Sequence, residues 1–163
     1  MRKYVAFFIL LVIIPAILFS GCGKWNSPLD VSVVQQTLQE NYDDIMVIVE
    51  YLAESQYEVV IITDTSGEML ADLKTVSIEN DKVCTAVKKL IKNGIYQKVF
   101  KTENTISFLQ KAITMGNISC YLAYSINGVD SPQLQYLTET IPLEQENWYY
   151  CICDYEKSRL EHT

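Results

Sequence analysis

Three oxygen-bearing side chains follow a short β-branched run and have the spacing of a cation-binding loop. Asp64, Ser66 and Glu68 come directly after Glu58–Thr63, which we expect to be a buried strand. Carboxylate and hydroxyl oxygens are ligands that Mg²⁺ accepts readily. The loop is therefore the candidate metal site. A plain polar turn is the alternative, because Asp, Ser and Gly are common turn residues.

The same loop resembles the motifs of two protein families. Asp64 and Ser66 match the Asp-x-Ser-x-Ser loop of von Willebrand factor A domains, with Glu68 in place of the second hydroxyl. That resemblance implies a bound Mg²⁺ and a parallel sheet with alternating strands and helices. Asp64 also resembles the nucleophile of haloacid dehalogenase phosphatases. That family has a downstream acidic pair, which this sequence lacks.

Four cysteines beyond the N-terminal region raise the question of a disulfide or a zinc site. Cys151 and Cys153 are two residues apart on an expected strand, so both point to one face, where either could bond to Cys120 or Cys84. Zinc would need closely spaced ligands, and the sequence has no Cys-x-x-Cys. Buried free thiols are the alternative that the composition favours.

Nucleophilic catalysis finds little support in the residue types. His162 is the single histidine, and a Ser–His pair would have to join it to Ser158 near the C-terminus. The sequence also lacks a glycine-rich phosphate loop. We therefore predict no catalytic residue.

Aromatic side chains crowd the C-terminal part of the chain and could form a binding platform. They are Tyr121, Tyr124, Tyr136, Trp148, Tyr149, Tyr150 and Tyr155. Such a platform could bind a sugar or a peptide, because each of these side chains has an apolar body and a polar tip. Core packing is the alternative, since aromatic residues are enriched in strands anyway.

The N-terminus has the pattern of an export signal. Arg2 and Lys3 precede the apolar run Tyr4–Phe19, and Ser20–Gly21 stand before Cys22. This arrangement resembles the lipobox of bacterial lipoproteins cut by signal peptidase II. The resemblance implies a diacylglycerol and an N-acyl lipid on Cys22. An uncleaved anchor would be short, because 16 residues rise about 24 Å against a bilayer core of about 30 Å.

Signal cleavage changes both charge and length. It removes two basic residues and no acidic one, so the formal charge falls from −7 to −9. Such a surface repels nucleic acid and anionic lipid headgroups, so we expect the lipid to attach the protein and no nucleic-acid partner. We expect a signal peptide at 1–21, a lipid-anchored linker at 22–30, one domain at 31–156 and a tail at 157–163.

Hydrophobic periodicity predicts helices and strands in a particular order. Helices are expected at 31–55 and 82–93, with Asn80–Asp81 capping the second. Strands are expected at 58–63, 97–101, 105–109, 118–126, 136–141 and 148–154, while 69–78 fits a strand or a helical turn. The prediction is an α+β fold, with a mostly antiparallel sheet of about five to seven strands and two main helices packed on one face.

The last third of the chain resembles small uncharacterised proteins of Gram-positive bacteria. The matching segments are Tyr124–Gly128, Gln133–Thr138, Pro142–Leu143 and Trp148–Tyr150. The resemblance implies no activity. It favours a Gram-positive host, with the anchor on the outer, extracytoplasmic face of the cell membrane.

Taken together, the sequence predicts a lipid-anchored cell-surface lipoprotein with a non-enzymatic binding or accessory role. Its only cofactor would be the covalent lipid on Cys22, and its protein or envelope partner is unidentified. The alternative is a metal-dependent envelope enzyme or metal-binding module that uses Asp64, Ser66 and Glu68.

Overall fold

A computed structural model describes residues 27–113, 117–128 and 131–161. The signal-peptide, Cys22 and His162 predictions therefore lie outside the described residues. Within them, eight strands form one antiparallel sheet and four helices accompany it. The α+β class and the antiparallel sheet are confirmed. The predicted counts, five to seven strands and two main helices, were too low.

The elements follow one another with short connections. Their order is α2 (Val31–Glu40), α3 (Tyr42–Glu54), β1 (Val60–Ile62), β2 (Glu68–Ala71), β3 (Lys74–Ser77), α4 (Asp81–Lys92), β4 (Lys98–Thr102), β5 (Thr105–Ile113), β6 (Ile118–Ser125), β7 (Leu137–Pro142), β8 (Trp148–Asp154) and α5 (Tyr155–Glu161). The last five strands lie where the sequence predicts strands. Helix α5 overlaps the expected tail at 157–163.

The helix expected over 31–55 is two helices, because the chain breaks at Asn41. This residue has φ −121° and ψ 16°, and its side-chain amide donates to the Thr37 carbonyl at 2.9 Å. Asn is a weak helix former whose side chain competes for backbone partners. Next to the break, Tyr42 is 38% exposed, while Leu38 before it and Ile45 after it are fully buried.

The segment 69–78 is neither a single strand nor a helix but a hairpin. Strands β2 and β3 pair from Glu68↔Ser77 to Ala71↔Lys74. Asp72 and Leu73 form the turn, with φ values of 45° and 67°. Two successive positive φ values are those of a type I′ turn, whose twist matches the hairpin.

The strands lie in the order β3-β2-β1-β4-β5-β6-β8-β7. Helix α4 connects the first three strands to β4, which pairs antiparallel with β1. The side chain of Asn80 accepts hydrogen bonds from the N–H groups of Lys82 and Val83, so the predicted cap of α4 is confirmed. Gly94, with φ 69°, follows the end of that helix.

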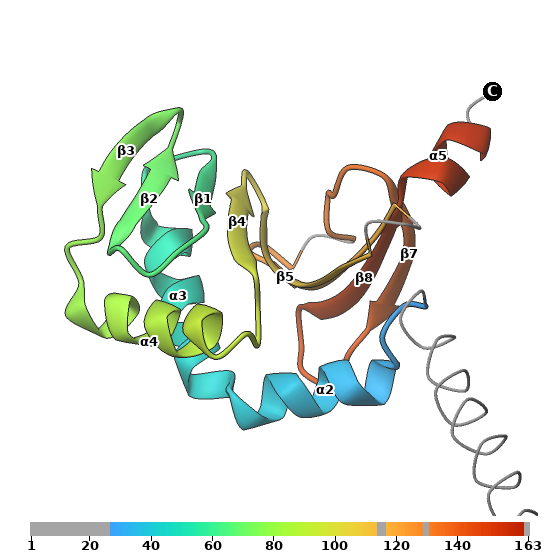
Figure 1. The fold of residues 1–163 in the computed structure, drawn as a ribbon, viewed down its shortest axis with the longest axis horizontal. Coiled ribbons are helices and arrows are strands. Elements are labelled where there is room, and N and C mark those ends of the chain that lie inside the picture. Colours follow the sequence, from blue (N-terminus) through green and yellow to red (C-terminus); the bar gives the residue numbers. More distant parts are fainter. Residues whose placement is uncertain (1–26, 114–116, 129–130, 162–163) are drawn as a thin grey trace, which may run out of the picture.

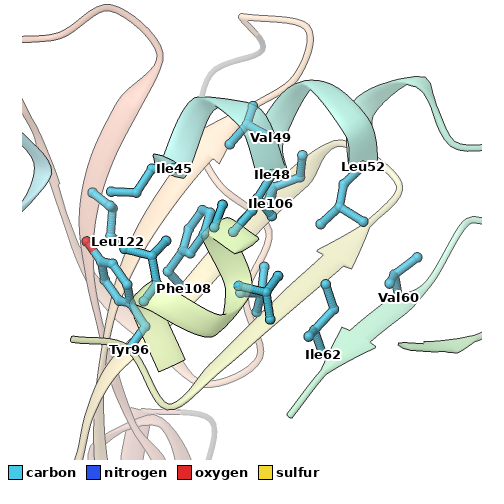
Figure 2. Packing of buried hydrophobic residues seen from close by; sticks show 14 of the residues in the cluster. Ile45, Ile48, Val49, Leu52, Val60, Ile62, Tyr96, Ile106, Phe108 and Leu122 are labelled. Carbon is cyan, nitrogen blue, oxygen red and sulfur yellow. The ribbon is translucent and has the colours of Figure 1, made fainter. Parts of the chain in front are cut away.

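Helices α2, α3 and α4 cover one face of the sheet and enclose the core. In Figure 1, α2 and α4 lie below the sheet, and the orange segment before β7 lies above it. Ile45, Ile48 and Leu52 of α3 are fully buried against strand residues such as Ile62 and Ile106 (Figure 2). Each such side chain contributes about 1.5–3 kcal/mol relative to exposure. We call this side of the sheet the helix-covered face.

Among the described residues, no helix is long and apolar enough to span a bilayer.

Candidate functional site

The opposite side of the sheet, which we call the open face, has a different surface chemistry. Because side chains alternate along a strand, the neighbours of each core residue point to this face. On β5, Ile106 and Phe108 belong to the core, while Thr105 and Ser107 lie on the open face. Thr105 and Ser107 alternate with the apolar residues of β5, so the pattern gives this face hydroxyl groups.

A cavity of about 390 Å³ lies on the open face, and we call it the aromatic cavity. Its lining comes from four strands, the segment before β7 and the start of α5. The lining residues are Phe100, Thr102, Ser107, Asn117, Ser119, Tyr121, Gln133, Leu134, Gln135, Tyr136, Cys153 and Tyr155. The volume is within the range of about 300–1,000 Å³ that is usual for small-molecule sites.

The segment ahead of β7 forms one wall of the aromatic cavity and is fixed to the sheet. The N–H of Gln133 donates to the Thr105 hydroxyl at 3.3 Å. The carbonyl of Tyr136 accepts from the N–H of Asp154 at 2.9 Å. On another side of the cavity, the carbonyl of Asn117 accepts from the N–H of Tyr155 at 3.2 Å. The bonds of Gln133 and Tyr136 hold the wall in place by its backbone and leave its side chains to line the cavity.

Two residues of the lining have left-handed backbone conformations. Tyr136 has φ 61° and Asn117 has φ 50°. Asn tolerates this region, but a bulky aromatic residue there costs about 1–3 kcal/mol. Such strain is concentrated at binding sites, where the surrounding structure holds a side chain in a required position. Here it places the Tyr136 ring against Tyr155, with ring centroids 4.9 Å apart and perpendicular planes.

The predicted aromatic platform is divided between the two faces. Tyr121, Tyr136 and Tyr155 line the aromatic cavity together with Phe100, whose ring lies 6.3 Å from that of Tyr121. Trp148 and Tyr150 are instead almost fully buried in the core of the helix-covered face. Core packing is therefore confirmed for Trp148 and Tyr150, while binding by the rings of the aromatic cavity stays a prediction.

The aromatic cavity has an uncharged lining at neutral pH. None of its lining residues is Asp, Glu, Lys, Arg or His. Burial raises the pKa of the Tyr121 hydroxyl, and burial raises the pKa of the Cys153 thiol to about 12. A protonated thiol is a poor nucleophile, so Cys153 supplies a small apolar surface. The arrangement is suited to binding by hydrogen bonds and ring contacts.

The predicted metal loop forms an exposed turn on the same open face. Asp64 Oδ1 accepts from the N–H of Ser66 at 2.8 Å, and the N–H of Glu68 donates to Ser66 Oγ at 3.2 Å. Hydrogen bonds from the Ser66 hydroxyl and N–H lower the pKa of Asp64. Within the described part of the chain, no three His, Cys, Asp or Glu residues are grouped to hold a metal ion. The hydrogen bonds are those of a polar turn.

The sheet differs from the fold that the two loop resemblances imply. A von Willebrand factor A domain needs a parallel sheet, whereas every strand pair that includes β1 or β2 is antiparallel. The loop joins β1 to β2 directly, without a helix following it. The likeness of Asp64, Ser66 and Glu68 to those motifs is therefore local.

The four described cysteines are free thiols in different surroundings. Cys151 and Cys153 share the open face, as predicted, because they pair with Tyr121 and Ser119 of β6. Cys120 pairs with Ile152 on the helix-covered face, so the sheet separates it from both. Cys84 lies on α4, where its thiol donates to the Ile78 carbonyl at 3.4 Å.

No protein-family model, curated protein or solved structure matches this chain.

Sequence reasoning missed several residues of the aromatic cavity. Phe100 and Ser107 are ordinary members of alternating strands, and only their pairing across β4 and β5 brings them together. Gln133 and Gln135 lie in a short polar segment next to Pro132. The density of neutral amides just before an aromatic residue is the one local signal that marks this segment.

Proposed function

We propose that this chain is a non-enzymatic, lipid-anchored binding domain of the cell surface, and that its aromatic cavity binds an uncharged sugar. One observation supports the proposal most: ring faces, hydroxyls and side-chain amides of uncharged residues surround the same cavity. A sugar ring has hydroxyls around its edge and C–H groups on its faces. Aromatic rings cover such faces, and amides both donate to and accept from such hydroxyls.

The amides favour a particular class of sugar. Gln133 and Gln135 each bring an amide donor and acceptor to the cavity lining, and Asn117, whose Nδ2 donates to Glu156 Oε1 at 3.4 Å, brings an amide oxygen. The acetamido group of an N-acetylated hexosamine has the matching acceptor and donor, and its methyl group needs apolar contact. An N-acetylhexosamine is therefore the sugar that we propose.

A peptide fits the aromatic cavity less well than a sugar. Peptides commonly bind sheets by adding a strand to an unpaired edge. The aromatic cavity lies over β4, β5, β6 and β8, which each have a partner strand on both sides. Side chains alone are thus available for recognition there.

Calorimetric titration of the detergent-solubilised full chain with N-acetylglucosamine tests the proposal. We expect saturable binding that Tyr155→Ala weakens about fivefold, the size of one lost ring contact. Tyr42→Ala is the matched control, because Tyr42 is also a half-exposed helical tyrosine, at 38% against 43%. An equal loss of sugar affinity in both variants would reject the sugar assignment. Binding of a neutral peptide without any binding of the sugar would reject it as well.

The lipid anchor is a separate part of the proposal. It is supported by the lipobox-like sequence before Cys22 and would place the domain on the outer face of the cell membrane. Labelled palmitate should enter the wild-type chain and not the Cys22→Ala variant. Equal labelling of the two, with unchanged precursor size, would reject lipidation.

A further inference from the structure

A second hollow lies beside the aromatic cavity on the open face. Its volume is about 370 Å³, and its lining residues are Ile61, Thr63, Asp64, Ser66, Glu68, Met69, Leu70, Thr75, Lys98 and Phe100. We call it the charged hollow, since it contains two carboxylates and an amine. Phe100 lines both spaces, so its ring stands between them.

The floor that joins the two spaces is one row of paired residues. Thr75 pairs with Leu70, Leu70 with Ile61, Ile61 with Phe100, and Phe100 with Ser107. Directly paired residues point to the same face, so this row crosses five strands. At about 4.8 Å per strand step, the row is roughly 19 Å long, several times the width of one sugar ring.

We infer that the aromatic cavity and the charged hollow form a single trough for an oligosaccharide that crosses Phe100. The inference rests on the proposed sugar-binding function and names the ligand as a chain of rings. In the floor, β2, β1, β4 and β5 each have a partner strand on both sides, so their backbone groups are used in strand pairing and a ligand lying across these four strands meets side chains only. An oligosaccharide can be bound in this way, through contacts with side chains alone.

The two ends of the trough offer different hydrogen-bonding groups to the same oligosaccharide. The aromatic cavity supplies neutral amides and hydroxyls. The charged hollow supplies the Glu68 carboxylate as an acceptor and the Lys98 amine as a donor. Sugar hydroxyls both donate and accept, and hydrogen bonds to charged groups are roughly twice as strong as neutral ones. A ring bound there adds affinity to the ring bound in the aromatic cavity.

The test is a titration of the full chain with β-1,4-linked N-acetylglucosamine oligomers of one to four units. We expect the trimer to bind at least about tenfold more tightly than the monomer, because it reaches the charged hollow. Lys98→Ala should remove most of this gain and leave monomer binding unchanged. Lys82→Ala, which alters an exposed lysine on α4, should change neither.

The outcomes separate this inference from the proposed function. If monomer and trimer bind equally, the trough is wrong and the sugar cavity stands. If the trimer gains affinity equally in wild type and Lys98→Ala, the oligosaccharide does not reach the charged hollow, and the inference is again wrong. If no oligomer binds, both proposals fail. Selective weakening of the trimer by Lys98→Ala supports both.

Discussion

The two faces of the sheet are made from the same strands and yet have different chemistry. Phe108 on β5 and Phe100 on β4 illustrate the contrast. Phe108 is fully buried among α3, Tyr96 and Trp148, whereas Phe100 is half-buried between two hollows. The helix-covered face therefore provides stability, and the open face is available for recognition. The role of a polar or aromatic residue therefore depends on which face of the sheet its position along the strand points to.

The largest expected effect is the difference in stability between variants at these two phenylalanines. Phe108→Ala should lower the free energy of unfolding by about 3–5 kcal/mol, because it leaves a cavity in a packed core. Phe100→Ala should cost only about 1 kcal/mol, since its ring keeps water contact in the folded state. Urea denaturation of both variants measures the difference. Comparable losses would contradict the assignment of separate roles to the two faces.

The buried thiols of the open face make the stability of the folded chain depend on pH. Burial raises the pKa of Cys151 and Cys153 to about 12, above the ordinary thiol value near 9. The folded chain then holds these protons more tightly than the unfolded chain, so stability is complete below about pH 9 and falls as pH rises toward 12.

Cys151→Ala and Cys153→Ala should each make this alkaline fall shallower. Unfolding under reducing conditions at several pH values checks the slope, and Cys84→Ala serves as a control with a more accessible thiol. An unchanged slope in both open-face variants would show that these thiols do not titrate as buried groups.

A substitution at Tyr136 tests whether its left-handed backbone conformation contributes to binding at the open face. Tyr136→Asn should relieve about 1 kcal/mol of left-handed strain and lose about 0.5–1.5 kcal/mol of ring contact with Tyr155. Stability should therefore change by less than about 1 kcal/mol. Binding of N-acetylglucosamine should weaken about fivefold, as for one lost ring contact. Thermal unfolding and calorimetry measure the two effects, and unchanged binding would remove Tyr136 from the site.

Asp64 gives the smallest expected effect. Asp64→Ala should lower the melting temperature slightly, because the Ser66 N–H loses its acceptor within the turn. Millimolar Mg²⁺ should leave the melting temperature of the wild-type chain unchanged. A rise that depends on Asp64 would instead support the metal-loop hypothesis.

Local pattern predicted much of the helix-covered face. The apolar period predicted one helix over 31–55, where the structure has α2 and α3, and Asn80 predicted the start of α4. The break at Asn41 could not be predicted, because the apolar period continues across it. The turn at Asp72 and Leu73 opposes the preference of leucine for negative φ, so the β2–β3 hairpin also had no clear signal.

The aromatic cavity could be predicted only in part. Its tyrosines were noticed as a group, but their division between the two faces depends on strand pairing. Phe100 and Tyr155 are 55 positions apart and line one cavity because β4, β5, β6 and β8 are neighbours. A helix can be recognised from the spacing of apolar residues in a short stretch of sequence, whereas the pairing of distant strands leaves no such local pattern.

Amide chemical-shift mapping of the full chain with the N-acetylglucosamine trimer tests whether the open face is the sugar-binding surface. We expect the shifts to gather at Phe100, Ser107, Ser119, Tyr121 and Tyr155 on the open face, and to spare Ile45, Ile48 and Leu52 of α3. Shifts concentrated on the helices, or no shifts at saturating trimer, would contradict the assignment of recognition to the open face.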